Sequence, residues 1–175
     1  WERMLIQCPQ HALDRTLARK LEPRASTPAK RLAAIRALSE AGVPAGVMTA
    51  PLIPALNDHE MEAILEAARE AGAGTASYVL LRLPLEIAGL FEEWLEAHAP
   101  DRKERVLKLV RETRGGRTYD SAWGKRMKGE GVYARMLAER FAAACRRYGF
   151  NRASWPLDSS AFVRPALERD QLSLF

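Results

Sequence analysis

Residues 22–58 contain the pattern that most restricts the fold of this chain. Thr27 followed by Pro28 predicts the start of a helix, because a hydroxyl residue caps the helix and proline fits its first position. Gly42 predicts the end of that helix. The apolar run 46–50 follows without polar alternation and stops at a proline. Such a run is typical of a strand that is covered on both faces of a parallel sheet.

The same alternation of helix and strand occurs once more. Residues 61–71 place apolar side chains on one helical face and end at Gly72, and residues 77–83 form a second apolar run that Pro84 ends. Helices that alternate with buried strands predict an α/β fold with a parallel sheet. Only two strands are recognisable, and two parallel strands cannot cover both of their faces. We therefore expect this chain to be part of a larger sheet.

Several further helices are expected from apolar periodicity and end signals. They lie at residues 13–21 with Asp14 as a cap, at 85–97, after Asp101, and at 132–148. The apolar side chains of residues 85–97 are interpreted as core. Asn57 with Glu60, and Asp101 with Glu104, each have the spacing of a capping box.

Composition and single motifs limit the possible functions. The chain has 175 residues, of which 47% are hydrophobic and 28% charged, as in one soluble globular domain. No apolar run approaches the roughly 20 residues that cross a bilayer, and no signal peptide is recognisable, so we expect a cytoplasmic protein without a membrane partner. Cys8 and Cys145 lie far apart, and no metal-ligand spacing, phosphate loop or nucleophile elbow is present. His11, His59 and His98 are scattered and expected to be exposed.

Residues 102–128 form a basic segment with ten basic and three acidic side chains. Tyr119 and Trp123 lie among these charges. One interpretation is a solvated helix followed by a loop. The other is a groove for nucleic-acid phosphates, with aromatic rings that stack on bases. The formal net charge of +5 favours polyanionic partners without identifying one.

The stretch from residue 22 to residue 58 resembles radical SAM proteins, most closely an uncharacterised bacterial branch related to spore photolyase. The shared segments are Glu22-Pro23, Ser26-Thr27-Pro28, Lys30-Arg31, Ala34, Ala41-Gly42, Pro44, Ala50-Pro51, Leu52-Ile53-Pro54, Asn57-Asp58 and residues 78–84. Residues 114–131 and the helix after them also look like that branch. The resemblance covers roughly residues 13–151.

This resemblance implies the C-terminal part of a partial (β/α)₆ TIM-like barrel. Residues 13–98 would belong to the barrel and 99–150 to a basic helical extension, with 1–12 an unassigned lead and 151–175 a flexible tail. Family members hold a [4Fe–4S] cluster on a C-x₃-C-x₂-C loop and cleave S-adenosylmethionine reductively to a 5′-deoxyadenosyl radical. This chain has no such cysteine loop. We therefore expect no cluster and no activity from the chain alone.

The resemblance also implies cofactor-binding residues. Arg24 resembles the arginine that pairs with the cofactor carboxylate, although a surface arginine is an equal alternative. Thr49 and Ala50 match the strand end that passes the adenosine. Leu81 and Arg82 match the strand whose backbone approaches the adenine. No metal ligand and no catalytic residue is assigned.

The chain ends in QLSLF, which resembles the peptide by which bacterial DNA polymerases and repair proteins bind the sliding clamp. Gln171 would supply an amide, and Leu172, Leu174 and Phe175 would supply apolar contacts. The alternative is a terminal segment that folds back onto the core. Three functions follow: a radical SAM fragment that acts on DNA or other nucleic acid, a non-catalytic module that binds DNA and the clamp, and an inert truncated product.

Overall fold

The computed structural model describes residues 6–119, 121–122 and 125–152. Its sheet has three parallel strands in the order β1-β2-β3, namely β1 (Ile6–Pro9), β2 (Ala45–Leu52) and β3 (Thr75–Leu80). The helices are α1 (Arg15–Leu21), α2 (Pro28–Glu40), α3 (Met61–Glu70), α4 (Ile87–His98), α5 (Lys103–Glu112), α6 (Lys125–Lys128) and α7 (Gly131–Tyr148), and the 3₁₀ turn η1 spans Asp58–Glu60. The predicted α/β fold with a parallel sheet is confirmed.

Strand β1 corrects the expectation of two strands and an unassigned lead. Ile6 pairs with Ala45, Pro9 pairs with Met48, and the Gln10 N–H extends the ladder to the Met48 carbonyl at 2.8 Å. The segment IQCP is too short to show a period and ends in proline, which obscured it in the sequence. The sheet therefore includes residues 6–9, ahead of the segment in which strands were expected.

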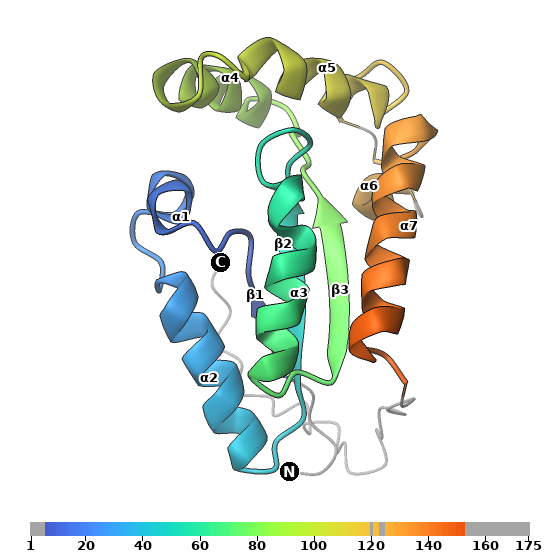
Figure 1. Ribbon diagram of the computed structural model, residues 1–175. Helices are drawn as coiled ribbons and strands as arrows, with labels where there is room; N and C mark the ends of the chain where they lie inside the picture. The colour runs from blue at the N-terminus through green and yellow to red at the C-terminus, as the bar shows by residue number, and fades with distance from the viewer. Residues whose placement is uncertain (1–5, 120, 123–124, 153–175) are drawn as a thin grey trace, which may run out of the picture.

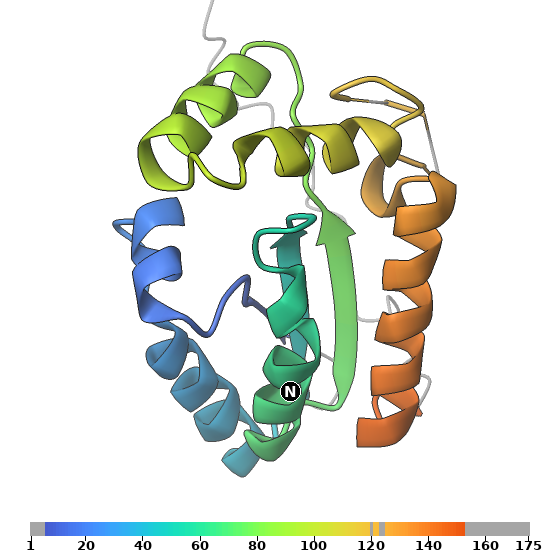
Figure 2. The same cartoon turned by 45° about the horizontal axis from the view of Figure 1, so that its top comes forward.

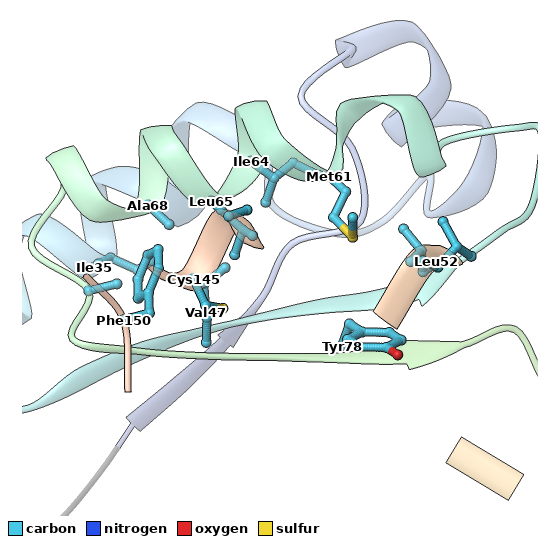
Figure 3. Packing of buried hydrophobic residues seen from close by; sticks show 14 of the residues in the cluster. Ile35, Val47, Leu52, Met61, Ile64, Leu65, Ala68, Tyr78, Cys145 and Phe150 are labelled. Atoms are coloured by element: carbon cyan, nitrogen blue, oxygen red, sulfur yellow. The ribbon is translucent and has the colours of Figure 1, made fainter. Parts of the chain in front are cut away.

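Helices α2, α3 and α7 cover one face of the sheet (Figure 1). The five apolar residues predicted for one face of α3, from Met61 to Ala71, are all at most 2% exposed. Figure 3 shows Ile64 and Leu65 of this helix above Val47 of β2. Gly72, which ends this helix, has a φ of 98°, as the predicted stop requires. We call this side the covered face of the sheet.

The other side, which we call the second face, consists of the alternate strand positions. These are Gln7 and Pro9 of β1, Gly46, Met48 and Ala50 of β2, and Thr75, Ser77 and Val79 of β3. None of them belongs to an apolar cluster of the described residues.

Gly46 places no side chain on the second face. Glycine is required there, because a Cβ would lie only 2.2 Å from Thr75 Oγ1. On the same face, the Ser77 hydroxyl of β3 reaches across β2 and donates to Gln7 Oε1 of β1 at 3.1 Å.

A second, smaller apolar cluster lies beyond the carboxyl ends of the strands, where α4 and α5 run across the molecule (Figure 2). Its buried members are Ile53, Leu56, Leu83, Leu95, Ala99, Val106, Leu107 and Val110. Of the five side chains of this segment expected to be core, Phe91, Trp94 and Leu95 lie in this cluster, whereas Ile87 and Leu90 are exposed. Leu95 is buried, but Leu85 and Leu90, before and within the helix, are 87% and 61% exposed.

Helix α7 packs into the main core rather than forming an extension. Leu137 is fully buried against the sheet cluster, and Cys145 is 8% exposed, as expected for a core thiol. Gly149 ends the helix with a φ of 74°. Within the described part of the chain, no helix is long and apolar enough to span a membrane.

Both predicted capping boxes are absent. Asn57 and Asp101 precede helical turns, but η1 and α5 have no side-chain cap hydrogen bond. Asp14, in contrast, caps α1 as predicted and accepts the Thr16 N–H at 2.7 Å.

Candidate functional site at the carboxyl edge of the sheet

Buried polar side chains gather where the strands end. Gln10 and His11 follow β1, Thr49 lies in β2, and Asn57 and Asp58 follow β2; each is at most 5% exposed. Burial of His11 corrects the expectation that all three histidines are exposed. Ligands in parallel α/β folds bind at this edge. We therefore treat the carboxyl edge of the sheet as the candidate site.

His11 lies in a charged environment contributed by α1 and α2. Its Nδ1 is 3.5 Å from Glu22 Oε2 and 3.4 Å from Arg31 Nη1, and Arg31 also forms an ion pair with Glu22. Burial lowers the pKa of His11, an effect that Glu22 and Glu60 oppose and Arg31 reinforces. The imidazole is therefore neutral near pH 7.

Arg31 and Asn57 hold the ends of β1 and β2 together. Arg31 donates to the carbonyls of Pro9 and Ser26, both at 3.0 Å. The Asn57 amide donates to the carbonyls of His11 at 2.7 Å and Pro51 at 2.9 Å, and its oxygen accepts the Ile53 N–H at 2.7 Å. Asn57, predicted to be a helix cap, therefore stabilises the loops at the site.

Three buried polar atoms at this edge have no hydrogen-bond partner among the described residues. They are Gln10 Oε1, His11 Nε2 and Thr49 Oγ1. Buried polar atoms in folded proteins are nearly always paired with protein or water. Of these, Thr49 Oγ1 lies on the covered face, so Gln10 Oε1 and His11 Nε2 are the two atoms of this edge that can offer polar contacts to a bound molecule.

The structure separates the predicted cofactor residues. Thr49 is fully buried and alternates with Val47 on the covered face, whereas Ala50 belongs to the second face and is half-buried. Arg24 is exposed in the turn between α1 and α2, and Arg82 is exposed after β3.

Leu81 follows the end of β3, next to β2. Its N–H donates to the Leu52 carbonyl at 3.0 Å, and its carbonyl accepts from Arg114 at 2.9 Å. The backbone of Leu81 is therefore already bonded within the protein on both sides.

Arg114, from the predicted basic groove, is a structural residue. It is 1% exposed and donates to the carbonyls of Leu80 and Leu81 at the end of β3 and of Lys125 and Arg126 in α6. These bonds hold α6 against the carboxyl edge. Sequence reasoning missed this role because an arginine beside two glycines is typical of an exposed loop.

Other cations of the basic segment also have protein partners. The Lys128 ammonium donates to the Tyr78 carbonyl at 2.8 Å and lies 3.4 Å from the centroid of the Tyr78 ring. Four further members form ion pairs, namely Arg102 with Asp101, Lys103 with Glu96, Arg111 with Glu92, and Lys125 with Glu130. Tyr119 is half-buried, and Trp123 lies outside the described residues. Few free charges remain for a phosphate groove in this segment.

The described residues contain no group of three or more His, Cys, Asp or Glu side chains that could hold a metal ion. Cys8 is half-buried in β1 and Cys145 is buried in α7, and both are free thiols. The clamp-like residues 171–175 lie outside the described part of the chain.

Comparisons with known proteins identify relatives but no function. No protein-family model matches the chain, and no solved structure matches it. Uncharacterised proteins of Mycobacterium tuberculosis and Mycobacterium bovis are each 32% identical over 155 residues. The aligned region covers 86% of this chain and 42% of each relative. The chain is thus similar to less than half the length of these mycobacterial proteins.

Proposed function

We propose that this chain is the C-terminal part of a radical SAM barrel and supplies one wall of the S-adenosylmethionine site. The observation that carries the proposal is the combination of sequential parallel strands with buried, unpaired polar atoms at their carboxyl ends. We infer that the cofactor is S-adenosylmethionine from the resemblance of residues 22–84 to radical SAM proteins. In the longer protein, the bound cofactor would supply a 5′-deoxyadenosyl radical on reductive cleavage.

The strand order is compatible with a barrel segment. A barrel adds parallel strands in sequence order and places its helices outside, an arrangement that one half of a doubly wound sheet shares. Here the order is sequential, and α2, α3 and α7 cover one face. Within the described strands, β1 and β3 each pair on one side only, which leaves edges where further strands can add.

The iron–sulfur cluster does not fit this chain. A [4Fe–4S] cluster needs several cysteine ligands, while the sequence holds only Cys8 and Cys145, which occupy different elements. The cluster ligands of the proposed enzyme must therefore come from a segment outside this sequence. Anaerobic treatment of this chain with iron and sulfide should yield neither a cluster nor 5′-deoxyadenosine.

The cofactor would lie against the carboxyl edge and the second face. Ala50 is small and half-buried there, so an adenosine group can approach the β2 backbone. Thr49 would contribute through its backbone, since its side chain lies on the covered face. The Leu81 carbonyl keeps a second lone pair beside its bond from Arg114. Arg24 is exposed and long enough to meet a carboxylate.

Binding of S-adenosylmethionine to the chain tests the proposal. Calorimetry should detect binding, and amide resonances of residues 46–52 should shift. Ala50→Leu, which adds bulk to the second face, should weaken binding at least tenfold. Ala138→Leu, on the exposed side of α7, is the matched control and should bind as the original chain does. No binding by the original chain, or unchanged binding by Ala50→Leu, contradicts the proposal.

A second candidate function is a non-catalytic module that binds DNA and the sliding clamp. The QLSLF sequence favours it. Leu174→Ala with Phe175→Ala should abolish capture by an immobilised bacterial sliding clamp, whereas Leu167→Ala should not. Equal capture of both variants contradicts a role of these residues in clamp binding. An inert truncated product, the third possibility, predicts no cooperative thermal unfolding of the chain.

A further inference from the structure

Free positive charge gathers at the corner formed by α1 and α2. Residues 14–40 hold seven basic and three acidic side chains, a net charge of +4 against +5 for the whole chain. This differs from the basic segment 102–128, where Arg114 is buried and four other cations form ion pairs. Counting basic residues in the sequence points to segment 102–128. The exposed cations without an ion pair point instead to the corner formed by α1 and α2.

Two adjoining hollows lie at this corner. Arg15, Arg19 and Thr27 border the first, and Arg15, Thr27 and Lys30 border the second. Arg15 and Arg19 are four residues apart on α1, so their side chains share one helical face. Three cations from two helices thus border these two neighbouring hollows.

The nearby carboxylates are already occupied. Glu22, which borders the first hollow, forms its ion pair with Arg31, and Asp14 caps α1. Arg15, Arg19 and Lys30 are exposed, and none has an ion pair with a described residue. Within the described part of the chain, these three cations at the corner are exposed and lack an ion-pair partner.

We propose that the α1–α2 corner binds the phosphate backbone of nucleic acid. Guanidinium and ammonium groups neutralise phosphates, and such contacts position a duplex without reading its sequence. The hollows are open and bordered by cations on two helices, which suits successive phosphates of a polyanion. The proposal is independent of cofactor binding at the carboxyl edge.

The test compares two triple variants for binding to a fluorescent DNA duplex over a series of salt concentrations. Arg15→Gln, Arg19→Gln and Lys30→Gln together should weaken binding at least tenfold. They should also lower the slope of log affinity against log salt concentration by about 2 to 3, at about 0.9 per lost phosphate contact. The matched control neutralises three exposed cations on α5 and α7, namely Arg105, Lys108 and Arg135. It should change affinity less than twofold.

Several outcomes overturn the proposal. They are no duplex binding by the original chain, equal losses in the two triple variants, or binding that the corner variant retains. Loss of binding to anionic lipid vesicles with unchanged DNA binding also overturns it, because the corner would then serve a membrane surface. Calorimetry with S-adenosylmethionine should give the same result for both triple variants, which separates this proposal from the cofactor site and checks that the variants are folded.

Discussion

The two faces of the sheet differ in what their side chains contact. On the covered face, Val47, Leu52 and Tyr78 pack under three helices and are at most 4% exposed. On the second face, Met48 and Ala50 are half-buried, and Ser77 uses its hydroxyl to reach Gln7. The same strands thus provide a core on one side and a polar, shallow surface on the other. The first determines stability, and the second is the face on which we propose that the cofactor binds.

The largest expected effect on stability comes from truncating a buried side chain under the covered face, compared with one on the second face. Ile64→Ala removes a fully buried side chain under the covered face and should lower the free energy of unfolding by about 4 kcal/mol. Met48→Ala on the second face should cost about 1 kcal/mol, because its side chain is partly hydrated already. Urea denaturation measures both. Equal losses would show that the second face is also core.

Arg114 gives the next largest effect, at the edge where both faces end. Arg114→Met removes the Arg114 donor from four backbone carbonyls, of which that of Lys125 still accepts the Gly129 N–H, and should cost about 3 kcal/mol. Hydrogen exchange should increase first in α6, which these bonds hold. Arg117→Met, at an exposed position, should stay within about 0.5 kcal/mol of the original chain. Similar stability of the two variants would refute the structural role of Arg114.

Tyr133 of α7 donates to Asp58, which links α7 to the loop after β2. Burial and this carboxylate raise the pKa of Tyr133 from 10.0 to about 12. Because the folded pKa is the higher one, the stabilisation is complete below pH 10 and is lost as the pH rises from 10 to 12. After allowance for solvent screening the loss is about 1 kcal/mol. Tyr133→Phe should remove this alkaline dependence, and an unchanged pH profile would contradict it.

His11 should give the smallest effect, on the acid side. Burial lowers its folded pKa below the unfolded value of 6.5, so the unfolded chain binds the proton more tightly. The contribution is complete above pH 6.5 and is lost as the pH falls through 6.5 toward the folded pKa. His11→Gln should flatten this part of the stability profile. If the stability of His11→Gln still falls with decreasing pH as steeply as that of the original chain, other groups cause the acid dependence.

Local sequence signals predicted the helices and strands that carry clear periods or end signals. The apolar face of α3 and the glycines after α2, α3 and α7 are where the pattern placed them. The short strand β1 was missed because four residues carry no period, and it becomes visible only through its pairing with β2.

The site was less predictable, since its chemistry depends on contacts between distant segments. His11 lies near Glu22 and Arg31 only because β1, α1 and α2 meet at one edge. Arg114 has a structural role because it donates to carbonyls more than thirty residues away, at Leu80 and Leu81. Neither set of contacts can be predicted from the residues that neighbour His11 or Arg114 in the sequence.

Methionine oxidation in the presence and absence of S-adenosylmethionine tests the central claim most directly. Met48 lies on the second face and is half-buried, Met61 lies under the covered face and is 0% exposed, and Met136 of α7 is 37% exposed. Hydrogen peroxide should oxidise Met136 and Met48 but spare Met61 in the folded chain. Millimolar S-adenosylmethionine should slow the oxidation of Met48 and leave Met136 unchanged. Oxidation of Met48 at the same rate with and without the cofactor would contradict a cofactor site on the second face.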